Sequence, residues 1–207
     1  MEKMCFVAVG DGVKLSVLEW PGEKRPFLLL HGLSSNATTW RLVARELAAA
    51  GHRVLAVDQR GHGLSDKPDD GYDFETVTGD VARLLEVMAV ERPFLAGQSW
   101  GGNVALAFGA YHPGRAQAII GVDGGTIDFQ AEASRTWAQV SAELKPPDWR
   151  GTPYQTMWTN MHRWHPEWSD EALEMTLNNF ERLPDDTITP RLTLARHMQI
   201  LYELWQE

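Results

Sequence analysis

The chain has 207 residues, of which 43% are hydrophobic and 23% are charged, and its formal net charge is −9. This composition is typical of a globular domain that buries one full core and has room for an appended subdomain. The negative charge argues against a nucleic-acid partner, which needs a basic face, and against an anionic membrane surface. Because the lone Cys5 cannot form an internal disulfide and no signal peptide or membrane span is evident, we expect a cytoplasmic protein.

The first half of the chain predicts alternating strands and helices. Extended segments at residues 6–9 and 14–20 flank a hairpin turn at Gly10-Asp11-Gly12. Apolar runs predict strands buried on both faces at residues 27–30, 53–57, 94–96 and 117–122. Apolar residues at helical spacing predict helices over residues 38–50, 74–90 and 103–111. Strands that alternate with helices imply an α/β fold with a mainly parallel sheet and flanking helices.

The pattern changes after Gly124-Gly125. From residue 126 onward we expect no buried strand, only helix-like segments that prolines interrupt. Six of the nine tryptophans fall in this part and are expected to form its core, with one or two lining an acyl pocket: Trp137, Trp149, Trp158, Trp164, Trp168 and Trp205. The sequence therefore predicts an α/β core over residues 1–125 and a helical cap over residues 126–207.

A serine motif follows the apolar run at residues 93–96. The motif fits G-x-S-x-G and reads Gly97-Gln98-Ser99-Trp100-Gly101-Gly102. In such a motif the serine lies on a tight strand-to-helix turn that exposes its hydroxyl, and glycines are needed where side chains would collide. A predicted strand before Ser99 and a predicted helix after it are the context that the motif requires. Ser99 is therefore the predicted nucleophile.

A second motif, His31-Gly32-Leu33, follows the strand at residues 27–30. Attack on an ester carbonyl creates an oxyanion, which two backbone N–H groups can stabilise. The amide of Trp100, at the start of a helix, and the amide of Leu33 are the predicted donors. We expect His31 to be structural, with its ring hydrogen-bonded to nearby backbone.

Three motifs in this order resemble the α/β-hydrolase fold family: residues 29–32, residues 58–66 and the Ser99 motif. The resemblance covers the whole chain and implies the first six strands of that fold, with a cap inserted after the sixth. It also implies a serine hydrolase that needs no cofactor and acts on a small-molecule substrate. In the family the segment at 58–66 holds loops in place, so Arg60 and His62 are expected to be structural.

The resemblance further implies an acid and a histidine, which follow the nucleophile on two later strands. The chain ends before those strands, so neither position is present. Asp123, at the end of the sixth strand, is one candidate acid, and a cap histidine (His162, His165 or His197) is one candidate base. The three-residue spacing of His162 and His165 also suggests a metal site, but without a third ligand we expect a surface pair and no metal.

The predicted activity is hydrolysis of small, largely apolar carboxylic esters through an acyl-enzyme on Ser99, with little turnover by this chain alone. The same scaffold leaves open a carbon–carbon bond hydrolase, an aminopeptidase or a cofactor-free haloperoxidase. A non-catalytic ligand-binding protein is a further alternative, as is one half of a split enzyme. In the last case a complementary C-terminal fragment would pair with the unpaired edge of the sixth strand. A homo-oligomer is a further alternative.

Overall fold

The computed structural model describes residues 1–126, 129 and 135–206, and its main element is a six-stranded sheet. The strand order is β1-β2-β4-β3-β5-β6. The first two strands pair antiparallel, β2 pairs antiparallel with β4, and the other neighbours are parallel, as predicted. The strands are β1 (Lys3–Gly10), β2 (Val13–Trp20), β3 (Lys24–Leu30), β4 (His52–Val57), β5 (Phe94–Gln98) and β6 (Ala118–Val122).

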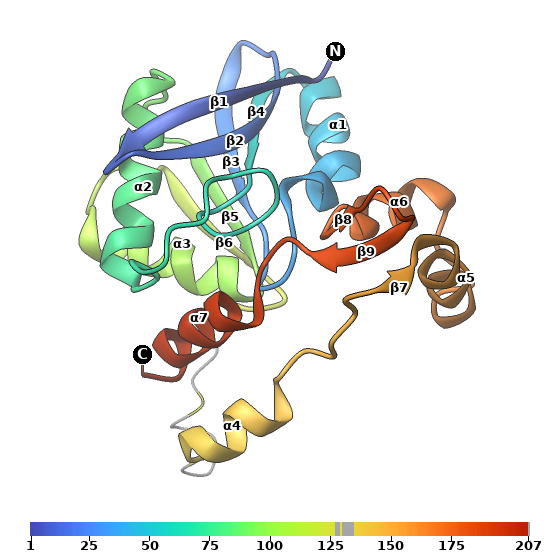
Figure 1. The fold of residues 1–207 in the computed structure, drawn as a ribbon. Helices are drawn as coiled ribbons and strands as arrows, with labels where there is room; N and C mark the ends of the chain where they lie inside the picture. The colour runs from blue at the N-terminus through green and yellow to red at the C-terminus, as the bar shows by residue number, and fades with distance from the viewer. Residues whose placement is uncertain (127–128, 130–134, 207) are drawn as a thin grey trace.

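Helices cover both faces of this sheet (Figure 1). α2 (Phe74–Val87) and α3 (Trp100–Tyr111) pack on one face, while the 3-10 turn η1 (Ala37–Trp40) and α1 (Arg41–Ala49) pack on the other. The alternation of side chains along β3 explains its continuous apolar run: Leu28 and Leu30 lie in the larger core cluster, and Leu29 lies in the smaller one. The predicted strands and helices of the first half are thus confirmed, but the expected burial of residues 117–122 on both faces is wrong, because β6 is an edge strand and is largely exposed.

The second half of the chain is not wholly helical, which corrects one expectation. It contains a small antiparallel sheet in the order β7-β9-β8, where β7 is Thr152–Pro153, β8 is Phe180–Arg182 and β9 is Thr187–Pro190. Ile188 of β9 is fully buried in the cluster that holds this lobe together. Strands of two to four residues are too short for an alternating pattern to show in the sequence.

Four helices accompany the small sheet: α4 (Trp137–Glu143), α5 (Tyr154–Trp164), α6 (Asp170–Leu177) and α7 (Leu194–Gln206). Figure 1 shows α5, α6 and the small sheet as a lobe beside the core, whereas α4 lies below and α7 returns to the core. The lobe is tied to the loop after β3 by Asn36, whose side-chain amide donates to the Met175 carbonyl at 3.0 Å. Helices α5 and α6 therefore belong to a separate lobe, α7 packs on the core, and α4 packs against α7.

The returning helix α7 is firmly attached to the core. Ile200 and Leu204 are buried in the main core cluster. Arg196 donates to the carbonyls of Lys67 and Pro68 at 2.7 and 2.9 Å. Arg196 and His197 of α7 thus contact the loops that follow β4 and β3, at the carboxyl ends of two parallel strands.

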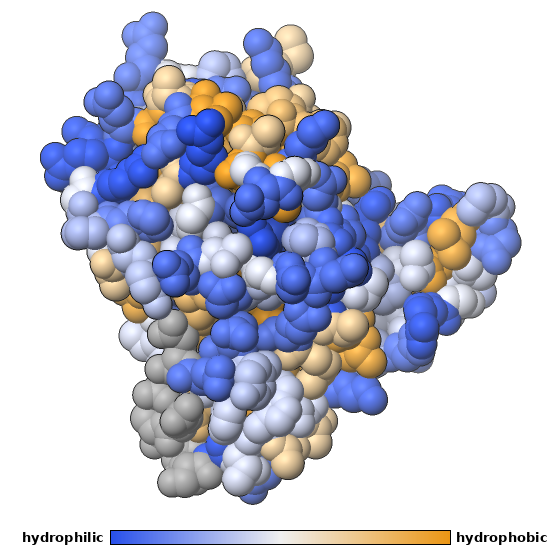
Figure 2. Space-filling view, turned by 60° about the vertical axis from the view of Figure 1, so that its left-hand side comes forward, coloured by the Kyte–Doolittle hydropathy of each residue, from blue (hydrophilic) through white to orange (hydrophobic). Residues whose placement is uncertain are grey.

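Strand β6 forms one edge of the main sheet and is poorly covered. Ile120 and Val122 are each 38% exposed, although strands of a parallel sheet are normally buried on both faces. Figure 2 shows hydrophilic side chains over most of the face in view, with apolar patches mainly near its upper edge. None of the helices in the described ranges is long and apolar enough to cross a membrane.

Candidate active site

Ser99 lies at the junction between β5, which ends at Gln98, and α3, which begins at Trp100. Its backbone has φ 51° and ψ −124°, a combination that residues other than glycine rarely adopt. Its N–H donates to the Val122 carbonyl at 3.1 Å, and its carbonyl accepts from Gly102 N at 2.8 Å. The tight turn thus holds a strained serine between the sheet and the first turn of α3.

The glycines of the motif are required by close backbone approach. A Cβ on Gly97 would overlap the Gly101 carbonyl, and a Cβ on Gly101 would lie 2.5 Å from the carbonyl oxygens of Leu30 and His31. No side chain can move aside at either place, because the obstructing atoms belong to the backbone. The need for glycine two residues before and two residues after Ser99 is therefore confirmed in geometric terms.

Both predicted oxyanion donors lie next to Ser99. Trp100 is the first residue of α3, where the backbone N–H groups have no intrahelical partner. Leu33 lies in a turn closed by the hydrogen bond from Ser35 N to the Gly32 carbonyl at 3.1 Å. A Cβ on Gly32 would lie 3.1 Å from the Ser99 Cβ, so this turn borders the nucleophile directly. The role of these two amides in stabilising an oxyanion stays a prediction.

His31 and His62 are buried, and each forms a hydrogen bond with nearby backbone, while His62 Nε2 has no hydrogen-bond partner among the described residues. His31 Nδ1 donates to the Gly32 carbonyl at 2.8 Å, and its Nε2 accepts from Gln59 N at 3.1 Å. His62 Nδ1 donates to the Arg60 carbonyl at 3.0 Å, and its ring stacks on Trp100 at 5.4 Å. Burial lowers the pKa of both imidazoles. These contacts fit the structural role expected for each.

The loop after β4 is fixed by two carboxylates. Asp58 accepts from Ala37 N at 2.7 Å and from Leu64 N at 2.9 Å, so it joins this loop to the one after β3. Arg60 makes a two-pronged ion pair with Asp80 of α2 at 2.5 and 2.7 Å, and both side chains are almost fully buried. These contacts agree with the structural role expected for Arg60.

In the described part of the chain, no side chain hydrogen-bonds to the Ser99 hydroxyl. Asp123 directly follows β6 with φ 48°, is exposed, and has no hydrogen-bond partner among the described residues. In the lobe, His162 Nε2 lies 3.5 Å from Asp170, and His165 stacks on Trp168. Across the described ranges, no group of three His, Cys, Asp or Glu side chains is placed to hold a metal ion.

The third candidate base, His197, contacts a different serine. Its Nδ1 lies 2.8 Å from Ser34 Oγ, in the turn that carries Leu33, and its Nε2 lies 3.2 Å from the Leu144 carbonyl. Sequence reasoning grouped His197 with the other cap histidines and gave no sign of this contact. The contact arises only because α7 returns to the core 163 residues after Ser34.

A comparison with a model of the alpha/beta hydrolase fold finds a match over residues 25–196. The chain belongs to the α/β-hydrolase fold family. Epoxide hydrolase B of Mycobacterium tuberculosis is 37% identical over 105 residues, which are 49% of this chain and 30% of that protein. Non-heme chloroperoxidase CPO-A1 of Kitasatospora aureofaciens is 34% identical over 111 residues, which are 53% of this chain and 40% of that protein.

Solved structures of α/β-hydrolases agree with the fold. The crystal structure of E-2-(acetamidomethylene)succinate hydrolase superposes with a TM-score of 0.82 at 23% identity, over 99% of this chain and 74% of that one. At this identity the likeness supports the fold alone. The matches with the curated relatives take in well under two thirds of those proteins' length.

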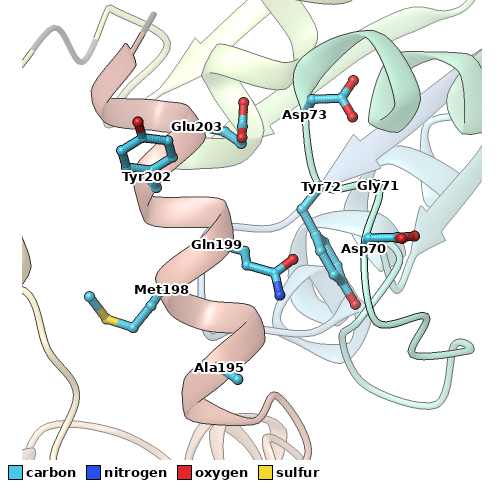
Figure 3. A pocket seen from close by; sticks show the side chains of 9 residues that line it. All are labelled: Asp70, Gly71, Tyr72, Asp73, Ala195, Met198, Gln199, Tyr202 and Glu203. Atoms are coloured by element: carbon cyan, nitrogen blue, oxygen red, sulfur yellow. The ribbon is translucent and has the colours of Figure 1, made fainter.

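A groove of about 400 Å³ lies away from Ser99, between α7 and the loop that leads into α2 (Figure 3). Tyr72 and Asp73 line one side, and Gln199 and Glu203 of α7 line the other. The Tyr72 hydroxyl donates to the Pro68 carbonyl at 2.7 Å. Since none of the residues discussed for catalysis lines this groove, it is distinct from the candidate active site of the α/β-hydrolase.

Proposed function

We propose that this chain carries the nucleophile of a serine hydrolase that acts on small, largely apolar carboxylic esters through an acyl-enzyme on Ser99. The observation that carries the proposal is the strained Ser99 turn, with the Trp100 amide on one side and the Leu33 turn on the other. A partly exposed serine between two amide donors suits attack on a carbonyl carbon, because charge develops where those donors can reach it.

The kind of nucleophile helps to choose among the activities of the relatives. A serine that opened an epoxide would be left as an ether, which water does not readily hydrolyse. A serine that attacks an ester is left as an ester, which water can hydrolyse to regenerate the enzyme. Ester hydrolysis is therefore favoured over epoxide opening, while the similarity to a chloroperoxidase keeps a haloperoxidase as the second candidate.

We further propose that the base and acid come from outside these 207 residues, on a segment that pairs with β6. The open edge and exposed apolar side chains of β6 support this, as does the absence of a base at Ser99 in the described residues. Hydrogen–deuterium exchange tests the edge: the outward-facing amides of β6 should exchange rapidly in the isolated chain. Slow exchange throughout β6 would show that the edge is already covered.

Labelling with a fluorophosphonate tests the nucleophile. Peptide mapping should find the probe on Ser99, and the Ser99→Ala variant should lose that adduct. Steady-state hydrolysis of p-nitrophenyl esters by the isolated chain should stay far below the turnover of about 10 s⁻¹ that is common for enzymes. Turnover at that level would contradict the proposal that the base lies outside these residues, and it would indicate Asp123 as the acid with a cap histidine as the base. Absence of any adduct on Ser99 would refute its role.

A further inference from the structure

Ser34 makes the kind of serine–histidine contact that Ser99 lacks among the described residues. Its Oγ lies 2.8 Å from Nδ1 of His197, and the Nε2 of the same ring lies 3.2 Å from the Leu144 carbonyl oxygen. A carbonyl oxygen can only accept a hydrogen bond, so Nε2 carries the ring proton and Nδ1 is the acceptor. The Ser34 hydroxyl therefore donates its proton to the lone pair of His197.

This chain of contacts has the parts of an activated nucleophile. A base must lie within hydrogen-bond reach of the hydroxyl, and a third group must hold the base in the correct tautomer. The His197 ring meets the first condition and the Leu144 carbonyl meets the second. His197 is only 6% exposed, and this burial lowers its pKa, which keeps the ring neutral and able to accept a proton at pH 7.

Ser34 is accessible to a substrate, whereas the position of His197 is fixed by contacts of α7 with the core. Ser34 is partly exposed, and its φ of 61° places it in the left-handed region, as is also the case for Ser99. The helix that carries His197 is fastened by the Arg196 contacts with the loop after β4 and by the burial of Ile200. The acceptor atom of His197 is thus positioned by the core rather than by the lobe.

We propose that Ser34 is a second acyl-accepting serine, with His197 as its general base, and that activated aryl esters are its substrates. Ser34 Oγ forms a bond to the acyl carbon while its proton passes to His197 Nδ1. Collapse of the tetrahedral intermediate breaks the carbon–oxygen bond to the aryl group, and the phenolate leaves with the electron pair. The imidazolium then returns its proton to the phenolate or to water. This step is independent of Ser99.

The test uses the 207-residue chain and p-nitrophenyl acetate. The release of p-nitrophenolate is followed during the first turnover, and peptide mapping by mass spectrometry locates the acetyl group. We expect acetyl on the peptide that contains Ser34 and its loss in Ser34→Ala. The Ser35→Ala variant is the matched control, because Ser35 Oγ contacts the Thr39 hydroxyl at 3.2 Å and no histidine, and its acetylation at Ser34 should match the wild type.

His197 is tested separately from folding. General-base catalysis contributes at least about 100-fold, so His197→Gly should acetylate Ser34 about 100-fold more slowly, and added imidazole should restore much of the rate. A thermal melt of the same variant reports its folding. Acetyl found only on Ser99 would overturn the proposal while supporting the proposed function. Acetyl on neither serine, with both variants merely less stable, would show that Ser34 and His197 only tie α7 to the core.

Discussion

Replacing Ser99 by glycine should stabilise the protein relative to replacement by alanine. A non-glycine residue held in a sparsely populated backbone region costs about 1–3 kcal/mol, and Ser99 has φ 51° and ψ −124°. Alanine keeps this strain, whereas glycine releases it. Glycine also loses more conformational freedom on folding, which costs about 0.5–1 kcal/mol. The difference leaves Ser99→Gly more stable than Ser99→Ala by about 1 kcal/mol.

Urea unfolding of the two variants measures this difference, and a thermal melt should show a gap of about 2–4 °C. Ser141 provides the matched control, because it lies inside α4, where glycine should instead be less stable than alanine by about 1 kcal/mol. If Ser99→Gly proved less stable than Ser99→Ala by the same amount as the Ser141 pair, the Ser99 turn would not be strained.

Three further predictions concern residues that support the loops and turns around Ser99. Gly97→Ala should lower the free energy of unfolding by several kcal/mol, because its Cβ would overlap a backbone carbonyl of α3. The control Gly79→Ala, in α2 with nothing within 4 Å of the new Cβ, should stabilise the protein by about 0.5–1 kcal/mol, and equal effects of the two variants in urea unfolding would contradict the overlap. Asp80→Leu should destabilise the protein by about 3–5 kcal/mol, because it leaves the buried guanidinium of Arg60 unpaired. Adding Arg60→Met should recover part of that loss, and a double variant no more stable than Asp80→Leu alone would argue against a stabilising Arg60–Asp80 ion pair. Burial, with a smaller effect of a neighbouring histidine, lowers the folded-state pKa of His62 well below 6.5, so below about pH 6.5 the unfolded chain binds a proton that the folded chain does not. Stability should therefore fall as the pH drops through this range, and His62→Phe should remove up to about 1.4 kcal/mol per pH unit from the slope; an unchanged slope in melts at pH 5 to 7 would refute the assignment.

Local chemistry was enough to predict the first half of the fold. The run at residues 27–30 is apolar throughout because β3 is buried on both faces, with Leu28 and Leu29 in different core clusters. The glycines around Ser99 are dictated by backbone atoms only a few residues away or on the adjacent strand. Because these constraints act over short stretches or through simple periodicity, the sequence pattern carries them.

The lobe and the histidine contacts depend on the tertiary structure. The short strands of the lobe hold together because Ile188 is buried among residues of α5 and α6, and a four-residue strand shows no period of its own. His197 meets Ser34 only because α7 crosses back to the core.

The sequence by itself thus determined the sheet, the glycine-bounded turn and the serine at the centre of that turn. Only the tertiary structure decided which histidine reaches which serine. The physical reason is the range of the interactions: turn geometry and burial act between near neighbours in the chain, whereas a hydrogen bond of 2.8 Å between residues 163 positions apart depends on the packing of everything between them.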